Sequence, residues 1–567
     1  MARTVGIGHQ DFGDVIRKNL FYVDKTAFIK EWWENEDSVT LIMRPRRFGK
    51  TLNMSMLEYF FSVKHAGRGD LFEGLSIWQE EKYRKLQGTF PVISLSFANV
   101  KETTYSMARK KVCQMLANLY VKHSFLLESN ILQETDVNYF KRVSEHMDDS
   151  DASIALYQLS DFLYRYYGKK VIILLDEYDT PMQEAYVGGY WEELAGFTRS
   201  MFNSTFKTNP YLGRAVMTGI TRISKESIFS DLNHLEVVTT TSGRYEKAFG
   251  FTQQEVFAAM DEFGRTDKEA VKAWYDGFTF GDVRDIYNPW SISNYLDKGK
   301  FDTYWANTSA NSLASKLLRE GSIDLKRQFE VLLEGGTIRG KIDEQIVFSQ
   351  LDQNGDAVWG LLLASGYLKV VSHREITDVT DAWFGGELEY ELVLTNGEVR
   401  MMFGNMVRSW FARSRSDYNE FVRAMLAGDI DAMNGYMNRV ALNTFSYFDT
   451  GKDASGAQPE KLYHGFVLGL LVELNGRYRL TSNRESGFGR YDVMLEPLNR
   501  KDSAIILEFK VFRPQKESAL EDTVQEALKQ IEEKNYEQKL VDVGIERARI
   551  RKYGFAFEGK QVLIGEG

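Results

Sequence analysis

The sequence has almost no cysteine, little proline and no long hydrophobic run. Its 567 residues include one cysteine, Cys113, and 8 prolines. A single cysteine excludes an internal disulfide and any zinc site built from several cysteines, and it fits a reducing compartment. No stretch approaches the roughly 20 apolar residues that a membrane-spanning helix needs, and the N-terminus lacks the apolar core of a signal peptide. We therefore expect a cytoplasmic protein that is neither exported nor inserted into a membrane.

An excess of basic charge is also missing. The chain has 70 Lys and Arg against 80 Asp and Glu, a net charge of −10 at pH 7. It has no general positive field to attract nucleic acid, so any nucleic-acid-binding surface must be local, and tight nonspecific DNA binding is disfavoured. Apolar residues at 43% and charged residues at 26% match an ordinary globular protein. Its length predicts roughly two to four domains.

The first 240 residues or so alternate short apolar runs with amphipathic helices, the pattern of an α/β domain with a largely parallel sheet. The expected strands are 39–43, 91–97, 171–175, 214–218 and 236–241, and two of the expected helices are 51–61 and 108–120. From residue 252 to about 375 the pattern is mostly helical. It ends in WGLLLASGYLKVV, which together with a strand at 387–396 indicates a small helical or winged-helix module. Another helical stretch runs from about 398 to 445.

The polar, glycine-containing segment 449–461 marks a domain boundary. Beyond it the expected order is α-β-β-β-α-β, with a helix at 463–474, strands at 478–482, 491–495 and 504–509, a helix at 520–534, and a last apolar run at 553–557 and 561–564. We therefore predict three parts: a nucleotide-binding α/β domain (1–245), a helical lid with a winged-helix-like region (246–448) and a C-terminal α/β domain (449–567).

The motif RPRRFGKT, residues 44–51, follows the strand at 39–43 and precedes an amphipathic helix, which is the setting of a P-loop. Lys50 is expected to pair with the phosphates of ATP and Thr51 to ligate Mg²⁺. The rest of the predicted phosphate-binding loop is Arg44, Arg46, Arg47 and Gly49. The general motif has glycine where this chain has Arg44, at a place that favours positive φ or close backbone approach. GKT alone is common by chance, and Lys50 could instead be an ordinary charge at a helix start.

Two later strands carry polar residues suited to the same site. KKVIILLDEYD places Asp176 and Glu177 directly after an apolar run. There Asp176 could hold Mg²⁺ and Glu177 could polarise the attacking water. RAVMTGITRIS ends in Thr218, Thr221 and Arg222, which are suited to sensing the γ phosphate. Asp176 could instead cap a strand end, and Arg222 could form a surface ion pair. Their order on successive strands favours ATP binding.

A second constellation lies in SGFGRYDVMLEPLNRKDSAIILEFKVF. Asp492 opens one strand, and the period-two geometry of the next strand points Glu508 and Lys510 to one face. Two carboxylates beside a lysine can form a site for Mg²⁺ or Mn²⁺ that activates water. Gln530, on the following helix, could bridge to this site. Further ligands could come from Glu460, His464 or Glu485, although His464 fits an ordinary helix residue better. The alternative for the whole motif is a solvated strand with an ordinary Glu and Lys pair.

With these residues in place, the chain resembles the bacterial AAA-ATPase-like proteins that carry a C-terminal PD-(D/E)xK nuclease domain. The resemblance covers nearly the whole length, through FYVDKTAFI, RPRRFGKT, LLDEYDTP, GITRISKESIFSDLNH, WYDGFTFG, YNPWSISNYL, ESGFGRYD, LEFK and ALKQIEEKNY. It implies an N-terminal P-loop ATPase-like domain and a C-terminal restriction-endonuclease-like α/β domain. It assigns Asp492, Glu508 and Lys510 to a metal-dependent active site, and it makes Arg44 usual for the family. It supplies no substrate.

The sequence thus predicts a nucleotide-regulated, metal-dependent nuclease that acts on DNA, with ATP and Mg²⁺ (or Mn²⁺) as cofactors. One alternative is an ATP-binding switch or scaffold whose nuclease fold binds without cutting. Another is an RNA substrate. A homo-oligomer is compatible with the sequence, which does not fix the number of subunits.

Overall fold

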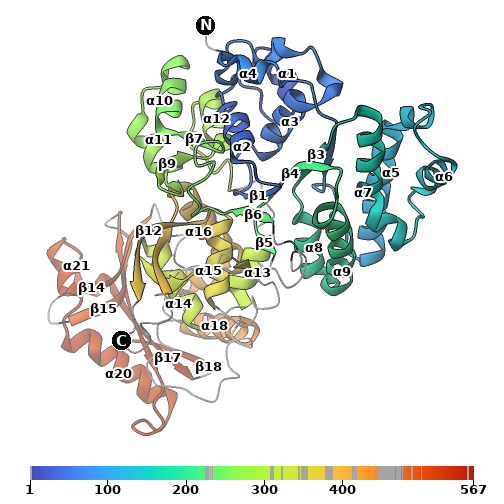
Figure 1. Cartoon of the computed structure of the whole chain (residues 1–567). Coiled ribbons are helices and arrows are strands. Elements are labelled where there is room, and N and C mark those ends of the chain that lie inside the picture. Colours follow the sequence, from blue (N-terminus) through green and yellow to red (C-terminus); the bar gives the residue numbers. More distant parts are fainter. Residues whose placement is uncertain are drawn as a thin grey trace. The chain divides into compact units, whose positions relative to one another are not determined.

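The chain forms two compact units, Met1–Gly404 and Asn405–Gly567. The computed structural model describes residues 3–223, 229, 232, 234–306, 312–320, 323–342, 345–346, 355–376, 387–411, 418–444, 467, 471, 474, 477–486, 489–499, 501–558 and 561–567. Figure 1 shows the helices and strands of each unit. Within these ranges, no helix is both long and apolar enough to cross a membrane.

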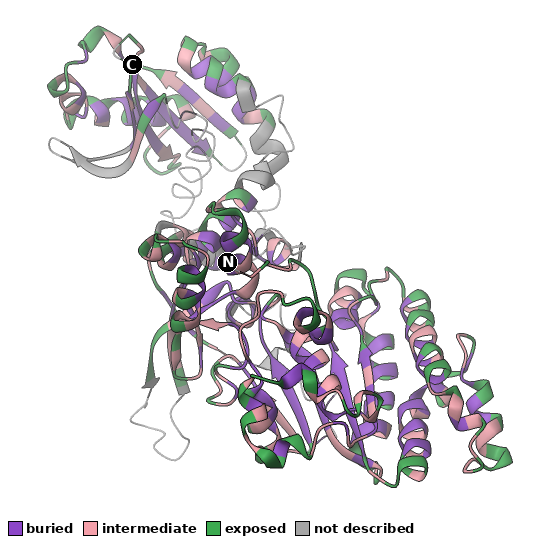
Figure 2. Cartoon of the chain, turned by 90° about the horizontal axis from the view of Figure 1, so that it is seen from above, coloured by how far each residue is buried: buried purple, intermediate pink, exposed green. Residues whose placement is uncertain are grey.

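A parallel sheet forms the centre of the first unit, as the sequence predicts. Its strand order is β2-β3-β4-β1-β6. The strands are β1 (Val39–Met43), β2 (Val92–Ser96), β3 (Val171–Asp176), β4 (Leu212–Gly219) and β6 (Leu235–Val238). Every residue of β1 and β3 is buried, as expected for parallel strands with helices on both faces. In Figure 2 these strands are purple, and the surrounding helices are green on their outer sides.

Helices lie next to β1, β2, β3 and β4 in the chain. They are α1 (Phe12–Arg17), α2 (Ala27–Asn35), α3 (Lys50–Phe61), α5 (Tyr105–Lys122), α6 (Glu134–Arg142), α7 (Asp149–Tyr167), α8 (Thr180–Gly188) and α9 (Trp191–Phe202). Helices α5 and α7 contact each other on the side of the unit where α6 also lies (Figure 1). Helix α3 joins β1 through the loop 44–49, so β1 delivers the RPRRFGKT motif to the carboxyl edge of the sheet.

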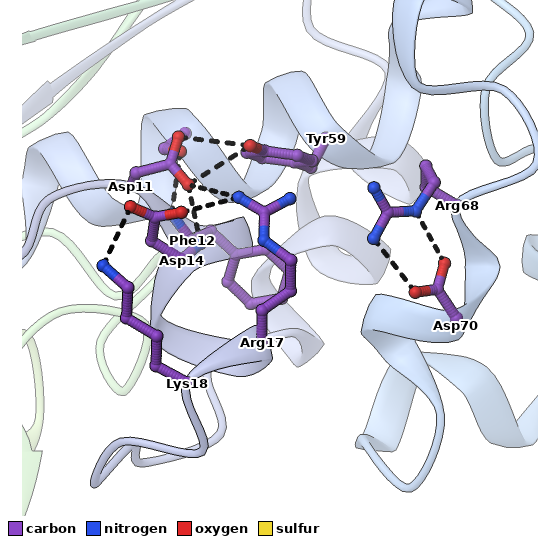
Figure 3. Close-up of polar contacts among 9 residues, drawn as sticks. Asp11, Phe12, Asp14, Arg17, Lys18, Tyr59, Arg68 and Asp70 are labelled. Carbon is purple, nitrogen blue, oxygen red and sulfur yellow. Dashed lines mark hydrogen bonds and ion pairs between the residues drawn. The ribbon is translucent and has the colours of Figure 1, made fainter.

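The N-terminal segment packs on α3 through helix α1 (Figure 3). The carboxylate of Asp11 caps α1 and also accepts a hydrogen bond from the Tyr59 hydroxyl of α3, 3.2 Å from each carboxylate oxygen. The Phe12 N–H donates to the Ser55 hydroxyl at 3.0 Å. Gly13 lies so close to α3 that a Cβ there would be 2.5 Å from the Tyr59 ring. The N-terminal end of α1 therefore packs closely against α3.

Two small antiparallel sheets lie in the rest of the first unit. The sheet β7-β9-β8 consists of β7 (Phe251–Thr252), β9 (Val283–Tyr287) and β8 (Phe278–Phe280), and the sheet β10-β13-β12 of β10 (Ile338–Lys341), β13 (Glu387–Leu394) and β12 (Leu368–Ile376). The helices are α10 (Gln253–Glu262), α11 (Lys268–Tyr275), α12 (Pro289–Lys298), α13 (Ser312–Glu320), α14 (Ile323–Glu334), α15 (Gly355–Ala364) and α16 (Gly397–Phe411). The run WGLLLASGYLKVV folds as helix α15, a turn with Gly366 at φ +84° and strand β12, as predicted.

The second unit is a mixed sheet with helices on both faces. Its order is β14-β15-β16-β17-β18, with β16 and β17 parallel and the other pairs antiparallel. The elements are β14 (Tyr478–Ser486), β15 (Gly489–Pro497), β16 (Ala504–Val511), β17 (Ile550–Glu558), β18 (Gln561–Glu566), α20 (Leu520–Glu533) and α21 (Gln538–Asp542). These strands and α20 agree with the predicted order. The predicted helix at 463–474 is described only at isolated positions.

Helices α17 (Tyr418–Ala427) and α18 (Ile430–Thr444) belong to this second unit. Their apolar side chains, including Phe421 and Met437, share one core with the strands. Asn434 also exchanges hydrogen bonds with the backbone of Ile564, at 2.8 and 2.9 Å. The second compact unit therefore begins at Asn405, whereas the sequence places the start of the last domain at 449. The two positions differ because α17 and α18 pack on the sheet of the second unit, although a polar segment (449–461) follows them in the sequence.

Candidate nucleotide and nuclease sites

The loop between β1 and α3 contains two residues with positive φ just before the helix begins. Gly49 is the N-cap of α3 at φ +80°, where a side chain would be strained. Arg47 also has a positive φ of 65°. Phe48 is buried between them, with its ring 4.7 Å from that of Phe278. The loop is thus shaped by one glycine, one strained residue and one apolar anchor.

Lys50 lies inside this loop, as the first residue of α3. Its Nζ donates to the carbonyl oxygens of Arg44 and Pro45, at 2.7 and 2.8 Å. The residue is only 5% exposed, and burial lowers the pKa of the ammonium, while the nearby carboxylates of Glu177 and Asp176 oppose this effect. The ammonium therefore sits at the N-terminal end of α3, on backbone partners that an incoming anion could replace.

Asp176 and Thr51 meet at the carboxyl edge of the sheet. The Thr51 hydroxyl donates to Asp176 Oδ2 at 2.7 Å, and the Thr218 hydroxyl donates to Oδ1. Asp176 is 4% exposed, and burial raises its pKa although both hydroxyls oppose the shift. The structure thus brings together residues from β1–α3, β3 and β4, as the sequence predicts.

Glu177 follows Asp176 in a strained conformation. Its φ is +52°, which is uncommon for a residue other than glycine, and its N–H donates to the Thr218 hydroxyl at 3.2 Å. Its side chain accepts from the Thr180 hydroxyl at 3.3 Å. Thr221 is not directed to the loop. It donates through its N–H and hydroxyl to the buried carboxylate of Asp179, at 2.9 and 3.0 Å.

The three loop arginines have separate surroundings. The guanidinium of Arg44 is fully buried, donates to the Thr239 carbonyl at 2.6 Å and lies 4.4 Å from the Phe280 ring centroid. It supports the loop through contacts with Thr239 and Phe280, and it is not on the exposed surface of the loop. Arg46 donates to Gln183 at 3.2 Å, and the exposed Arg47 stacks over Trp290 at 4.4 Å. Arg222 lies in strand β5 (Arg222–Ile223), which pairs with β11 (Gln345–Ile346), and its side chain is outside the described residues.

The second site lies where β16 faces α20. Along β16, Ile505 and Leu507 belong to the core under α17 and α18, whereas Ile506 belongs to the core under α20. This alternation carries Glu508 and Lys510 to the α20 side. There the side chain of Gln530 donates to Glu508 Oε1 and accepts from Lys510 Nζ. Glu508 is only 2% exposed.

Asp492 lies next to this group in the backbone register. Val493 of β15 pairs with Leu507 of β16, so Asp492 and Glu508 follow directly on that pair in neighbouring strands. The side chain of Asp492 is outside the described residues, as is that of Glu485 in β14. Glu460 and His464 also lie outside them. The structure therefore shows three of the predicted residues in contact and the fourth only by its place in the sheet.

Family comparisons match the two parts of the chain that carry these candidate sites. Residues 6–229 match the model of the family described as "Predicted AAA-ATPase". Residues 458–567 match the model of the PD-(D/E)XK nuclease superfamily. The chain combines an AAA-ATPase-like domain with a PD-(D/E)XK nuclease superfamily domain. It is also similar to a protein of Azotobacter chroococcum mcd 1 described as "Uncharacterized protein in vnfD 5'region", with 24% identity over 402 residues, 70% of this chain and 68% of that protein.

The donor atoms of both domains suit a hard divalent cation. In the AAA-ATPase-like domain the pair is a hydroxyl and a carboxylate, Thr51 and Asp176, already in contact. In the nuclease domain the described candidate donor is the carboxylate of Glu508, and the sequence predicts Asp492, on the neighbouring strand, as the second. Oxygen ligands of this kind favour Mg²⁺ or Mn²⁺ over zinc. Among the described side chains there is no group of three or more His, Cys, Asp and Glu residues arranged for a metal.

Sequence reasoning missed contacts that come from far along the chain. Tyr536 is buried, and its hydroxyl accepts from Gln530 at 3.2 Å in the nuclease domain. It lies in ALKQIEEKNY, but no spacing rule assigns it to the site. In the AAA-ATPase-like domain, the side chains of Asn288 and Trp305 donate to the Arg46 carbonyl. They follow Arg46 by 242 and 259 residues, and no local pattern signals contacts at such separations.

Proposed function

We propose that this chain is a nucleotide-regulated, metal-dependent nuclease that cleaves phosphodiester bonds in DNA. The observation that carries the proposal is the contact of Gln530 with both Glu508 and Lys510, because it holds a carboxylate and an ammonium together in a nuclease-superfamily domain. The buried Cys113 is the only cysteine, which supports a reducing, cytoplasmic setting.

In the nuclease domain, Asp492 and Glu508 would hold Mg²⁺ or Mn²⁺. Such an ion supplies charge stabilisation and a lowered pKa for water. Lys510 would orient the attacking water or offset the charge that develops on the phosphate. Gln530 would keep the Lys510 ammonium and the Glu508 carboxylate at a fixed separation. The contacts of Gln530 with Glu508 and Lys510 on the α20 side of β16 support these roles.

In the AAA-ATPase-like domain, Lys50 would leave its carbonyl partners to pair with the phosphates of ATP. Thr51 and Asp176 would hold Mg²⁺, and Glu177 would polarise the attacking water. Arg46, Arg47 and Arg222 are candidates for contacts to the nucleotide. Bound ATP would regulate cleavage by shifting the population of conformations that present Asp492 to the substrate.

Cleavage assays with a matched pair of lysine variants test the nuclease proposal. Lys510→Ala should lose Mg²⁺-dependent cleavage of a defined DNA, because the ammonium beside Glu508 is gone. Lys529→Ala should cut like wild type, because Lys529 is exposed on α20 and pairs only loosely with Glu533, at 3.7 Å. Equal loss in both variants, or in neither, would contradict the role of Lys510. A matched RNA substrate in parallel decides between DNA and RNA.

The net charge of −10 favours a second candidate function. An acidic protein has little general attraction for nucleic acid, so the chain could be an ATP-binding switch or scaffold whose nuclease fold only binds. In that case wild type would cut neither DNA nor RNA with Mg²⁺ or Mn²⁺, with or without ATP, while ATP would still bind. Metal-dependent cleavage that Lys510→Ala abolishes would exclude the scaffold.

A further inference from the structure

Two side chains from the region after the parallel sheet, Asn288 and Trp305, donate hydrogen bonds to the proposed phosphate-binding loop at residues 44–51. The carbonyl oxygen of Arg46 accepts a hydrogen bond from Trp305 Nε1 at 3.0 Å and another from Asn288 Nδ2 at 3.3 Å. Both donors come from the same compact unit as the loop. The Arg46–Arg47 peptide is therefore one of the points where the loop contacts the later region, together with the Phe48–Phe278 ring contact.

Anchoring this carbonyl also sets the direction of an N–H group. In a planar trans peptide, the carbonyl of one residue and the N–H of the next point in opposite directions. Because the Arg46 carbonyl points to Trp305 and Asn288, the Arg47 N–H points away from them. Backbone N–H groups are the main donors that such loops offer to phosphate. The strained φ of Arg47, +65°, is kept in place by the same anchor.

Trp305 is itself positioned by Glu398. Glu398 Oε1 accepts from the backbone N–H groups of Trp305 and Ala306, at 2.6 and 3.3 Å, and Oε2 accepts from the Ser291 hydroxyl at 2.8 Å. Glu398 is 1% exposed, so its carboxyl group cannot exchange these partners for water without local opening. The Trp305 ring also packs 5.5 Å from those of Phe278 and Tyr367.

We propose that Trp305 and Asn288 are positioning residues for phosphate binding at the loop, and that Glu398 acts through Trp305. This inference rests on the proposed binding of ATP by Lys50 and Thr51. The two donors hold the Arg46–Arg47 peptide in the orientation that aims the Arg47 N–H at the phosphates. Glu398 lies in the first turn of α16, so the same contacts link nucleotide binding to this helix.

Calorimetric titration of the full chain with ATP and Mg²⁺ tests the proposal through a matched pair of tryptophan variants. Trp305→Phe keeps an aromatic ring and removes the donor to Arg46. Trp359→Phe is the control, because Trp359 is equally buried but its Nε1 donates to Gln328 at 2.8 Å. One lost hydrogen bond should weaken ATP binding about 3- to 10-fold in Trp305→Phe, and Trp359→Phe should bind like wild type.

Two further comparisons separate positioning from general loss of stability. Asn288→Asp keeps the oxygen that caps α12, through the N–H groups of Trp290 and Ser291, but loses the donor to Arg46, so it should also bind ATP several-fold more weakly. Glu398→Ala should weaken binding, whereas Glu398→Gln should restore it because the amide oxygen still accepts from Trp305.

The outcomes distinguish this inference from the function on which it rests. If wild type and Trp359→Phe bind ATP and the Trp305 and Asn288 variants bind equally well, the positioning role is wrong while ATP binding stands. If wild type does not bind ATP, both are wrong. Weaker binding in Trp305→Phe and Asn288→Asp, with a thermal midpoint for Trp305→Phe no lower than that of Trp359→Phe, supports positioning.

Discussion

At the residue scale, the proposed nucleotide site contains charged groups that are already buried away from water. Burial lowers the pKa of Lys50 and raises that of Asp176, so each charge is disfavoured where it stands. The partners that offset this cost are exchangeable: loop carbonyls for the ammonium, and the hydroxyls of Thr51 and Thr218 for the carboxylate. A phosphate and a divalent cation would replace them with stronger, charge-assisted contacts.

A substitution at Glu177 should affect ATP hydrolysis without affecting ATP binding. Glu177→Gln keeps the shape and the strained backbone but loses the basic oxygen, so the variant should bind ATP like wild type and show at least a 100-fold lower ATPase rate. Glu192→Gln, at an exposed position of α9, should leave the rate unchanged. Phosphate release measures both. An unchanged rate in Glu177→Gln would remove this residue from the mechanism.

Glu398 should make the folded protein less stable as pH rises from about 4.5 to about 7. Burial, reinforced by Asp302, raises its pKa from 4.5 to about 7, against its hydrogen bonds. Between these pH values the folded protein keeps a proton that the unfolded chain has released, so this group stabilises the fold most at low pH and progressively less as pH rises to about 7. The difference amounts to about 3 kcal/mol.

Glu398→Gln cannot titrate, so its stability relative to wild type should increase between pH 5 and pH 8. Thermal unfolding of both proteins at pH 5 and pH 8 measures the difference in stability between them. Contributions of the other titrating groups cancel in this difference, because they are the same in both proteins. A difference that is the same at both pH values would show that Glu398 titrates normally.

At the scale of elements, the sequence predicts what depends on local pattern. Apolar runs identify the strands of both sheets, and the period of β16 correctly places Glu508 and Lys510 on one face. The sequence does not predict that the Arg44 guanidinium is buried behind the loop, because its partner Thr239 is 195 residues away. It also assigns α17 and α18 to the central region, since a polar segment follows them and only packing reveals the sheet they cover.

The packing of α1 on α3 gives a prediction at this scale. Gly13→Ala would place a Cβ 2.5 Å from the Tyr59 ring, which is held by Asp11 and stacks on His65 at 4.0 Å. The change should therefore destabilise the protein by about 1–3 kcal/mol. Gly196→Ala is the matched control in helix α9, where no atom of the described residues lies within 4 Å of a Cβ. It should be neutral or stabilising by up to about 1 kcal/mol.

Thermal unfolding of the two glycine variants measures these effects. A Gly13→Ala midpoint equal to that of wild type would mean that α1 can shift on α3 without loss. In that case the N-terminal segment would not fix the helix that carries Lys50.

At the scale of the whole molecule, the chain passes from the first unit to the second within helix α16. Helix α16 begins at Gly397, next to Glu398, and continues past the division between Gly404 and Asn405. Its Phe403 packs 5.3 Å from Tyr367, which contacts Trp305, so aromatic contacts run from the loop residue Phe48 through Phe278 to this helix. The proposed effect of ATP on cleavage would use these ring contacts and the backbone of α16.

The nuclease rate should therefore respond to ATP through Lys50. Wild type with Mg²⁺ at low salt should cut DNA at rates that differ several-fold with and without ATP. Lys50→Ala loses charge-assisted contacts to phosphate, should bind ATP at least 10-fold more weakly and should cut at a rate that ATP does not change. Lys64→Ala, at a lysine whose side chain is 72% exposed just after α3, should respond like wild type.

Measuring cleavage at several salt concentrations distinguishes the response to ATP from a change in DNA binding. Because the net charge is −10, affinity for DNA depends on a local basic surface that salt screens, so cleavage should fall between about 50 and 200 mM salt in all three proteins. The ratio of rates with and without ATP should persist at each salt concentration in wild type and Lys64→Ala, since it arises from the nucleotide site. If Lys50→Ala keeps the wild-type ratio, ATP acts at some other site and the coupling through this loop is wrong.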